Sequence, residues 1–279
     1  MVRRTVLFSP GDRPELCRGA PSTGADTVVF DLEDAVAPAR LAEARTAVAD
    51  LLADPEFDPA AEVAVRVAAD PDAAATDLDA VTDAGRLDAV MCPKADVGSV
   101  RRLADALAAR DSAVPILALI ETATGVLDAR DVAAHPAVDA CCFGAEDLAA
   151  DLGATRTDEG TEMLYARERV VLAARAAGVD AVDTVYTDLD DHEGLRAETR
   201  FAATLGYGGK MVVHPDQVDA VHGALAPDSE AVAWAKRVLA AREAADAEHR
   251  GVFEVDGEMI DAPLIARAER ILDRAPDSG

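Results

Sequence analysis

Residues 88–120 read DAVMCPKADVGSVRRLADALAARDSAVPILALI, and this stretch decides the fold class. It opens with a short apolar run (Asp88–Cys92), continues through a segment with apolar residues three and four positions apart (Val97–Arg110), and ends in a second apolar run (Pro115–Ile120). Both apolar runs have the length and aliphatic composition of buried strands, and the spacing between them is typical of a helix. The stretch therefore predicts a strand–helix–strand unit with parallel strands.

The same alternation continues from near the first residue to about residue 225. Eight runs rich in Val, Ile, Leu and Phe are strand candidates: Arg4–Ser9, Thr27–Leu32, Glu62–Val67, Asp88–Cys92, Pro115–Ile120, Ala140–Phe143, Val179–Asp183 and Lys210–His214. Eight strands, each followed by a helical segment, predict an α/β protein with a (β/α)8 TIM barrel. A doubly wound open sheet is the alternative. It usually has fewer strands and often a Gly-x-Gly-x-x-Gly turn after the first one, which this sequence lacks.

The last part of the chain follows a different pattern. A helical segment (Ser229–Ala247) leads into GVFEVDGEMID (Gly251–Asp261), which contains an Asp-Gly turn, and a last helix runs to about Asp273. We therefore expect residues 1–225 to form the barrel and residues 226–279 to form a C-terminal helical extension. Because the extension is short, we expect it to bury no core of its own and to be an appended arm rather than a second domain.

The composition is strongly acidic. The chain has 53 Asp and Glu residues but only 27 Lys and Arg, so its formal net charge is −26 and its sequence pI is about 4.4. A nucleic-acid partner would require the opposite balance, so nucleic acid is excluded. The carboxylates are dispersed and only three residues are lysine, which we expect of a halophilic protein in a high-salt cytoplasm, where salt screens self-repulsion.

Half of the 279 residues are apolar but only 4% are aromatic, so the core must be mainly aliphatic. No apolar run approaches the ~20 residues of a membrane span, so no membrane association is expected. The apolar stretch at the N-terminus is too short for a signal peptide, which predicts a soluble, cytoplasmic protein. None of the four cysteines forms a Cys-x-x-Cys pair, and we expect buried, reduced thiols.

Polar residues collect where the predicted strands end, which in barrel enzymes is the end that carries the active site. In chain order they are Asp12 and Arg13, then Asp31, Glu33 and Asp34, then Arg66, Lys94, Glu121, Glu146 and Asp147, Asp183 and His214. Several carboxylates cannot share a small mouth of low dielectric without a cation or shifted pKa values. A hard divalent metal resolves this, because Mg2+ typically takes one or two carboxylates together with waters and substrate. The residues alone leave open whether these side chains are metal ligands or solvated caps.

Seven strings carry a resemblance to a known family: LFSPGDRPE, VVFDLEDAVAP, PILALIETATGVL, FGAEDLAADLG, YARERVVLAARAAGVDAVDTVY, LGYGGKMVVHPDQV and DGEMIDAPL. In this order, over nearly the whole chain, they resemble the citrate lyase beta-subunit / malyl-CoA lyase family. The resemblance implies that Glu121 and Asp147 hold Mg2+, with Mn2+ as a substitute, and that Arg66 binds the carboxylate of an oxoacid. Backbone amides at Gly144 and Ala145 could donate to the same group.

Four further residues at the strand ends have two interpretations each. Glu33 and Asp34 orient waters around the metal, or Asp34 only caps the following helix. Arg13 and Lys94 contact phosphates of coenzyme A, or they only pair with nearby carboxylates. One departure from the family pattern lies beside Arg66, where many relatives read Val-Arg-x-Asn and this chain has an alanine, Ala68, in place of the amide.

The activity that the resemblance implies is that of a Mg2+-dependent carbon–carbon lyase. The substrate is a malyl-CoA-like 3-hydroxyacyl-CoA thioester, and the other side of the reaction is acetyl- or propionyl-CoA plus glyoxylate. Cleavage leaves a thioester enolate, which needs an acid/base on its other face. In malyl-CoA lyase-like enzymes an Asp of a Met-Ile-Asp lid motif, donated by a neighbouring subunit, serves there, and Asp261 matches it. We therefore expect a homotrimer or hexamer with exchanged lids, in which Met259 and Ile260 dock on an apolar surface.

Three other activities stay open. A malyl-CoA thioesterase would use the same metal site for hydrolysis, and a carrier-dependent citrate lyase beta subunit would be inactive alone. A Schiff-base aldolase would use Lys94 or Lys210, provided that burial lowered the pKa of the amine. His214 is expected to be structural rather than a proton carrier, and the role of Asp183 is left open.

Overall fold

The structure, a computed structural model, describes residues 3–247 and 250–275. The chain forms two compact units, which meet in the sequence between His222 and Gly223 and are described in turn. Within these described ranges, no helix is both long and apolar enough to cross a membrane.

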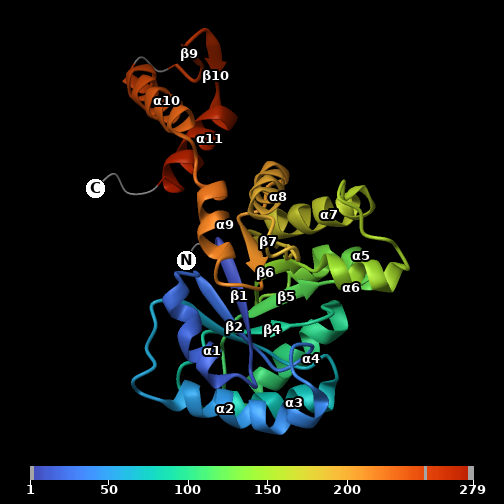
Figure 1. Cartoon of the computed structure of the whole chain (residues 1–279). Coiled ribbons are helices and arrows are strands. Elements are labelled where there is room, and N and C mark those ends of the chain that lie inside the picture. Colours follow the sequence, from blue (N-terminus) through green and yellow to red (C-terminus); the bar gives the residue numbers. More distant parts are fainter. Residues whose placement is uncertain (1–2, 248–249, 276–279) are drawn as a thin grey trace. The chain divides into compact units, whose positions relative to one another are not determined.

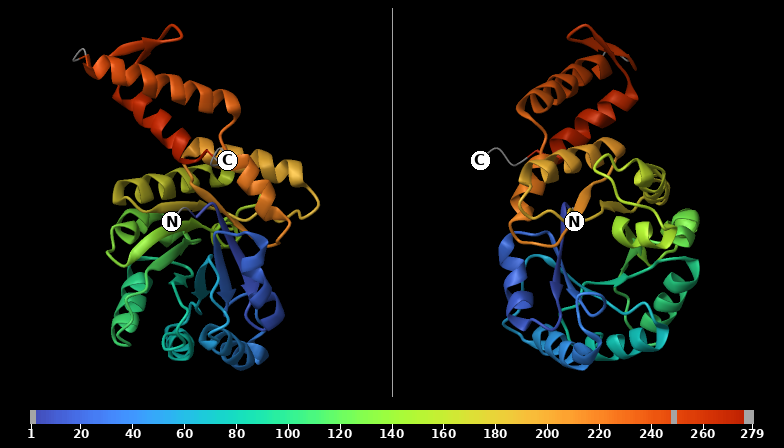
Figure 2. Two further views of the ribbon diagram at one scale, coloured as in Figure 1. Left: turned by 90° about the vertical axis from the view of Figure 1, so that its left-hand side faces the viewer. Right: turned by 45° about the vertical axis from the view of Figure 1, so that its right-hand side comes forward.

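The first unit is a closed barrel of eight parallel strands, with helices around it (Figures 1 and 2). The strands are β1 (Thr5–Pro10), β2 (Thr27–Asp31), β3 (Glu62–Arg66), β4 (Ala89–Cys92), β5 (Ile116–Ile120), β6 (Val138–Phe143), β7 (Asp180–Asp183) and β8 (Gly209–Val212). Each strand pairs with the next in the sequence, and β8 pairs with β1 to close the barrel. The predicted (β/α)8 TIM barrel is confirmed.

The helices of this part of the chain follow the strands and cover the outside of the barrel (Figure 2). They are α1 (Pro14–Gly19), α2 (Leu41–Ala53), α3 (Pro71–Val81), α4 (Val97–Ala108), α5 (Ala123–Ala133), α6 (Ala145–Leu152), α7 (Thr161–Ala177), α8 (His192–Leu205) and α9 (Gln217–Leu225), with short 3-10 turns at Ala20–Thr23 and Pro38–Arg40. Several begin on side-chain caps. Asp96 and Ser99 form a capping box at α4, and the Thr122 side chain accepts from the Gly125 N–H at α5. The cap at α5 fixes the turn that directly follows Glu121.

The inside of the barrel is filled by small and aliphatic side chains. The buried cluster consists of Val6, Val29, Ala64, Ala89, Met91, Leu117, Leu119, Ala140, Cys142, Val182 and Met211. Alternate residues of each strand point inward. The residues next to a cluster member along its strand therefore point outward, toward the helices. The aliphatic core that the composition predicts is therefore present.

Each of the eight strands differs from its predicted bounds, six of them by one residue at one or both ends, and β6 and β8 by two residues at one end. Strand β6 begins two residues before the predicted Ala140, because Val138 also pairs with Ile116. The polar residue Asp139 lies at a register shift in this pairing, and its side chain is 2.6 Å from Arg3. Strand β8 ends at Val212 instead of His214. The N–H groups of Val213 and His214 both donate to the side-chain oxygen of Gln217, which takes them out of the strand pairing.

The second unit contains α10 (Ser229–Ala247), a hairpin of β9 (Phe253–Val255) and β10 (Glu258–Ile260), and α11 (Ala262–Asp273). The hairpin turn is Asp256-Gly257, with φ values of 54° and 83°, as a two-residue turn of this kind requires. The unit buries its own cluster of Ala235, Val238, Ala245, Phe253, Val255, Ile260 and Ala268. The expectation that the arm has no core was wrong, because its hairpin closes over the α10–α11 pair.

Candidate active site

A cavity of about 340 Å3 lies at the carboxyl ends of the barrel strands. It is lined by Phe8, Asp31, Asp34, Ala35, Arg66, Leu119, Glu121, Gly144, Ala145, Glu146, Asp147, Thr184, Val185, Met211 and Val213. The residues contributed by β2, β3, β5 and β6 are largely charged, whereas those from β7, β8 and β1 are mostly apolar. The cavity therefore has a charged side and an apolar side, and it brings together most of the residues predicted from the sequence.

Glu121 follows β5 and is almost fully buried at the cavity, with 2% of its surface exposed. Its Oε1 accepts from the backbone N–H of Lys94 at 2.8 Å. Burial raises the pKa of Glu121 to about 8. The hydrogen bond from Lys94 opposes this rise, and the negative charges of Asp147 and Glu33 add to it. The positive charge of Arg66 also opposes the rise, but the pKa of about 8 still favours the neutral carboxyl at pH 7.

The loop after β4 aims its backbone at Glu121. Lys94 has a positive φ of 47°, which is uncommon for a residue with a side chain and costs free energy. This conformation presents the Lys94 N–H to the Glu121 carboxylate. Burial alone would lower the pKa of the Lys94 amine, but the charges of Glu33, Asp34 and Glu121 outweigh burial and raise it.

Arg66 ends β3 and is held by Asp31, a strand-end carboxylate to which the sequence assigned no role. Its Nε and one terminal nitrogen donate to the two carboxylate oxygens of Asp31, at 2.7 and 2.5 Å. Asp31 and Arg66 are register partners at the ends of β2 and β3. The remaining nitrogen, Nη1, has only longer contacts, at 3.3 Å to Glu33 and 3.5 Å to Asp34. The guanidinium is thus fixed by Asp31, with one nitrogen less tightly engaged.

The place of Asp31 at a strand end was predicted from the sequence, but its pairing with Arg66 was not. Asp31 is the last residue of β2, and neighbouring parallel strands end at the same side of the barrel. Its carboxylate also accepts from the N–H groups of Glu33 and Ala35, at 2.9 and 3.0 Å, so it shapes the loop after β2 as well.

Glu33 lies beside Arg66 and Lys94, is 10% exposed and has one oxygen without a hydrogen-bond partner. Burial raises the pKa of Glu33 to about 7; the charge of Asp34 adds to this effect and that of Arg66 opposes it. Its Oε2 makes no hydrogen bond, and its Oε1 lies 3.5 Å from the Lys94 amine. Together with Glu121 and Asp147, it gives this end of the barrel more carboxylates than nearby cations can neutralise.

This carboxylate excess fits a hard divalent cation. Asp147 is the third residue of α6 and is half-buried at the cavity wall, close enough to Glu121 for its charge to raise that pKa. Among the described residues, no three His, Cys, Asp or Glu side chains are arranged to hold a metal ion. The protein ligands would then be two carboxylates, and waters or substrate oxygens would complete the coordination, as is usual for Mg2+.

The backbone amides at the start of α6 differ from the expectation. The Gly144 N–H donates to the carbonyl of Ile120 at 3.0 Å, and the Ala145 N–H donates to the Thr184 hydroxyl at 3.0 Å. Both residues line the cavity, but their N–H groups are engaged, so the expectation that they donate to a substrate is not met here. The next two N–H groups, of Glu146 and Asp147, have no intrahelical partner because they lie in the first helical turn.

Asp183 and Lys210 belong to a buried ion network outside the barrel wall. Asp183 accepts from Arg167 at 2.7 Å and from Lys210 at 3.1 Å, and Lys210 also contacts Glu198 at 3.2 Å. Their strand neighbours Val182 and Met211 belong to the barrel interior, so Asp183 and Lys210 point toward the helices. Lys210 therefore cannot act as a Schiff-base amine in the cavity, and the raised pKa of Lys94 argues against that role there.

The remaining predicted residues lie apart from the cavity wall. Arg13, Lys94 and Glu33, although described, are not among its lining residues. Arg13 is 58% exposed and its nearest ion-pair contact is Asp12 at 4.0 Å. His214 is 45% exposed, and its ring nitrogen accepts from the Asp216 N–H at 3.2 Å, which is a local turn contact.

Asp261 lies in the second unit, where its side chain accepts from the Leu264 N–H at 3.5 Å and caps α11. Ile260 is fully buried in the core of that unit, so it is not available for docking elsewhere. Met259 is 70% exposed, as a docking residue would be. The expectation that Ile260 docks elsewhere is therefore wrong, and docking of Met259 stays a prediction.

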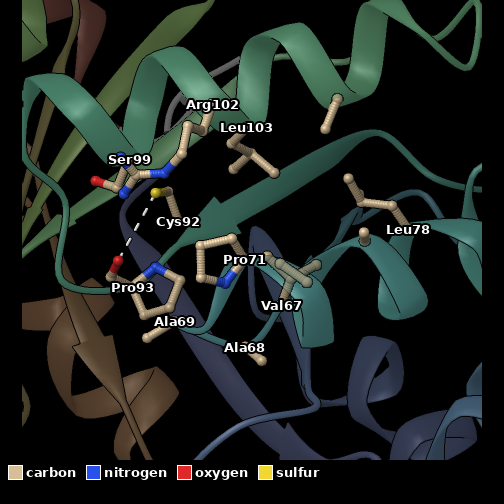
Figure 3. Close-up of a pocket in the computed structure, with 13 residues that line it drawn as sticks. Val67, Ala68, Ala69, Pro71, Leu78, Cys92, Pro93, Ser99, Arg102 and Leu103 are labelled. Carbon is tan, nitrogen blue, oxygen red and sulfur yellow. Dashed lines mark hydrogen bonds between the residues drawn. The ribbon is translucent and has the colours of Figure 1, made fainter.

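A second, smaller cavity of about 80 Å3 lies between α3 and α4 (Figure 3). Its walls are mostly apolar, with Val67, Leu78 and Leu103 among them. The thiol of Cys92 donates to the Pro93 carbonyl at 3.7 Å, and burial raises the pKa of this thiol to about 12. No Asp, Glu or His lines this cavity, so it offers no acid–base chemistry comparable to that of the larger one.

The residues and fold described above match known proteins. The family model for HpcH/HpaI aldolase/citrate lyase matches residues 4–215. A citrate lyase subunit beta-like protein of Deinococcus radiodurans is 41% identical over 96% of each chain. A mitochondrial citramalyl-CoA lyase of Mus musculus is 33% identical over 97% of this chain and 85% of its own.

A solved structure is similar as well. The protein CitE from Mycobacterium tuberculosis, in complex with magnesium, acetoacetate and coenzyme A, has a TM-score of 0.84 and 37% identity over 98% of both chains. On the strength of the family match and of these relatives, the chain belongs to the HpcH/HpaI aldolase/citrate lyase family.

Proposed function

We propose that this protein is a Mg2+-dependent lyase that cleaves or forms the carbon–carbon bond of a malyl-CoA-like 3-hydroxyacyl-CoA thioester, with glyoxylate and acetyl- or propionyl-CoA as the products of cleavage. The observation that carries the proposal is one cavity that combines Glu121, Asp147 and the fixed guanidinium of Arg66. Two of the similar proteins support this proposal. The mouse relative is named a citramalyl-CoA lyase, and the Mycobacterium tuberculosis structure contains magnesium and coenzyme A.

Glu121 and Asp147 would hold the cation, and Mn2+ could replace Mg2+. When bound, the ion would act as a Lewis acid on the oxoacid carbonyl. A cation here would also return Glu121 to its charged form, since it compensates the burial and the like charges that raise its pKa. Glu33 and Asp34 would orient waters around the ion.

Arg66 would bind the carboxylate of the oxoacid through Nη1, the nitrogen that Asp31 does not hold. The free amides of Glu146 and Asp147, at the positive end of α6, would donate to the same group, and Gly144 and Ala145 would contact it through the cavity wall.

The apolar part of the substrate has its own side of the cavity. The apolar side of the cavity is lined by Phe8, Val185, Met211 and Val213. Such a surface suits the hydrocarbon portion of an acyl thioester. Arg13 and Lys94, both exposed cations near strand ends, would contact the phosphates of coenzyme A. In an acidic protein, such cations offset the repulsion of a polyanionic ligand.

We further propose that Asp261 serves as acid/base on the enolate face of a neighbouring subunit's barrel, in a homotrimer or hexamer with exchanged lids. Its cap bond to Leu264 is long, at 3.5 Å, so the carboxylate gives up little when it turns to a substrate. The exposed Met259 next to it supports docking of this segment on an apolar surface.

Incubation of the isolated protein with malyl-CoA and Mg2+, in high salt and with or without EDTA, tests the proposal. Metal-dependent release of glyoxylate is expected. Malate with free thiol would instead identify a thioesterase. No turnover of this thioester or of citramalyl-CoA would favour a carrier-dependent subunit.

A further inference from the structure

The helix that carries Asp147 starts without a cap of its own. Helix α6 begins at Ala145, and its N-cap residue is Gly144, which has no side chain to accept from the first N–H groups. A Cβ atom at Gly144 would lie 2.7 Å from Cβ and 2.8 Å from Oε2 of Glu121. The close approach of Glu121 thus excludes a Ser, Thr or Asp cap at this position.

A residue from the neighbouring strand supplies the missing acceptor. Thr184 directly follows β7, which pairs with β6, and its Oγ1 accepts from the Ala145 N–H at 3.0 Å. Thr184 is 1% exposed and lines the cavity. The hydrogen bond joins residues 39 positions apart in the sequence, so it attaches the start of α6 to the barrel wall.

A different contact holds the solvent side of the same helical turn. Glu146 accepts from Arg156 at 3.0 Å, and Arg156 is in turn 2.8 Å from Glu162 at the start of α7. These residues are partly exposed, and ion pairs of that kind contribute little free energy. The buried hydrogen bond that Thr184 accepts from Ala145 is therefore the stronger constraint on where Asp147 lies.

We infer that Thr184 is a positioning residue that caps α6 from the end of β7 and thereby holds Asp147 in place for the divalent cation. The inference rests on the proposed function, because it takes Asp147 as a metal ligand. Groups that orient metal ligands from behind typically change metal affinity by about 10- to 100-fold when they are removed.

The test compares Mg2+ affinity, measured by calorimetric titration of the folded protein, among the wild type and four variants. Thr184→Val keeps the shape and removes the acceptor, and Thr184→Ser keeps the acceptor. Thr199→Val is the matched control, because Thr199 is equally buried and its hydroxyl bonds only within α8, to the Leu195 carbonyl. If Thr184→Val does not fold, Thr184→Ala takes its place.

We expect Thr184→Val to weaken Mg2+ binding by at least about tenfold, and Thr184→Ser and Thr199→Val to stay within about threefold of the wild type. A folded Thr184→Val protein with wild-type affinity would overturn the inference, and so would an equal loss in Thr199→Val. Asp147→Asn distinguishes a failure of the inference about Thr184 from a failure of the proposed metal site. If the wild-type protein binds no Mg2+, or Asp147→Asn binds it normally, the proposed metal site itself is wrong.

Discussion

The raised pKa of Glu121 predicts an unusual effect of Glu121→Gln on the metal-free protein. The carboxyl has a pKa of about 8 in the folded chain, against an ordinary value of 4.5. Because the folded state favours the neutral form, the stabilisation from this group is complete below pH 4.5 and is lost as the pH rises through about 8. Glutamine is neutral at every pH and keeps an oxygen for the Lys94 N–H.

The size of the effect follows from the two pKa values. At roughly 1.4 kcal/mol per pKa unit, ionised Glu121 lowers the free energy of unfolding by about 4 kcal/mol at pH 8 and by less than about 1 kcal/mol at pH 5. In EDTA, the Glu121→Gln protein should therefore be more stable than the wild type at pH 8 and similar to it at pH 5. Saturating Mg2+ should reverse the order at pH 8, because only the wild type retains both carboxylate ligands.

Urea unfolding in fixed high salt, at both pH values and with or without Mg2+, measures these differences. Glu159→Gln is the control, since Glu159 is exposed and should change the free energy of unfolding little at either pH. A Glu121→Gln protein that is less stable than the wild type in EDTA at pH 8 would refute the reasoning. A stability gap that does not change between pH 5 and pH 8 would refute it too.

Three further predictions follow from other parts of the molecule. Arg66→Lys should raise the KM for glyoxylate in the condensation direction by at least about tenfold, because lysine loses the fork held by Asp31; an unchanged KM would contradict this. The melting temperature should fall as salt is lowered from 1 M to 0.1 M, because the Debye length grows from ~3 to ~10 Å and the acidic residues repel one another more strongly. A melting temperature that does not change with salt would contradict the prediction of a halophilic protein. Asp261→Ala and Glu121→Ala should each be inactive, and co-refolding them in equal amounts should restore roughly a quarter of the sites if the lid acts in trans. Verified mixed oligomers without activity would mean that Asp261 does not act on a neighbouring subunit's barrel.

The fold was predictable because strands and helices leave different periods in the sequence. Each buried strand is a short aliphatic run, as in Pro115–Ile120, and eight such runs with helices between them have few packing solutions other than a barrel. The two largest errors in the bounds have different causes. Strand β6 extends past the polar residue Asp139, which interrupts the apolar run and lies at a register shift. Strand β8 ends early because Gln217 takes the N–H groups that would have extended it.

The charged residues of the cavity were predictable from their places at strand ends, but their partners were not. Which oxygen binds Arg66 depends on the register of β2 and β3, and this register exists only once the barrel is closed. The engagement of the Ala145 N–H by Thr184 depends in the same way on the pairing of β6 with β7. The core of the arm was missed because its apolar residues come from two helices and a hairpin, which are separate in the sequence and meet only in the folded chain.

The most direct measurement for the account is turnover of malyl-CoA as a function of Mg2+ concentration by the wild type, Glu121→Gln and Asp147→Asn, each verified as folded. We expect the wild type to release glyoxylate in a metal-dependent manner. Both variants should lose at least about a hundredfold in kcat, because metal activation of a carbonyl is worth several kcal/mol. If either variant keeps wild-type turnover in metal-limited buffer, Glu121 and Asp147 do not hold a catalytic metal.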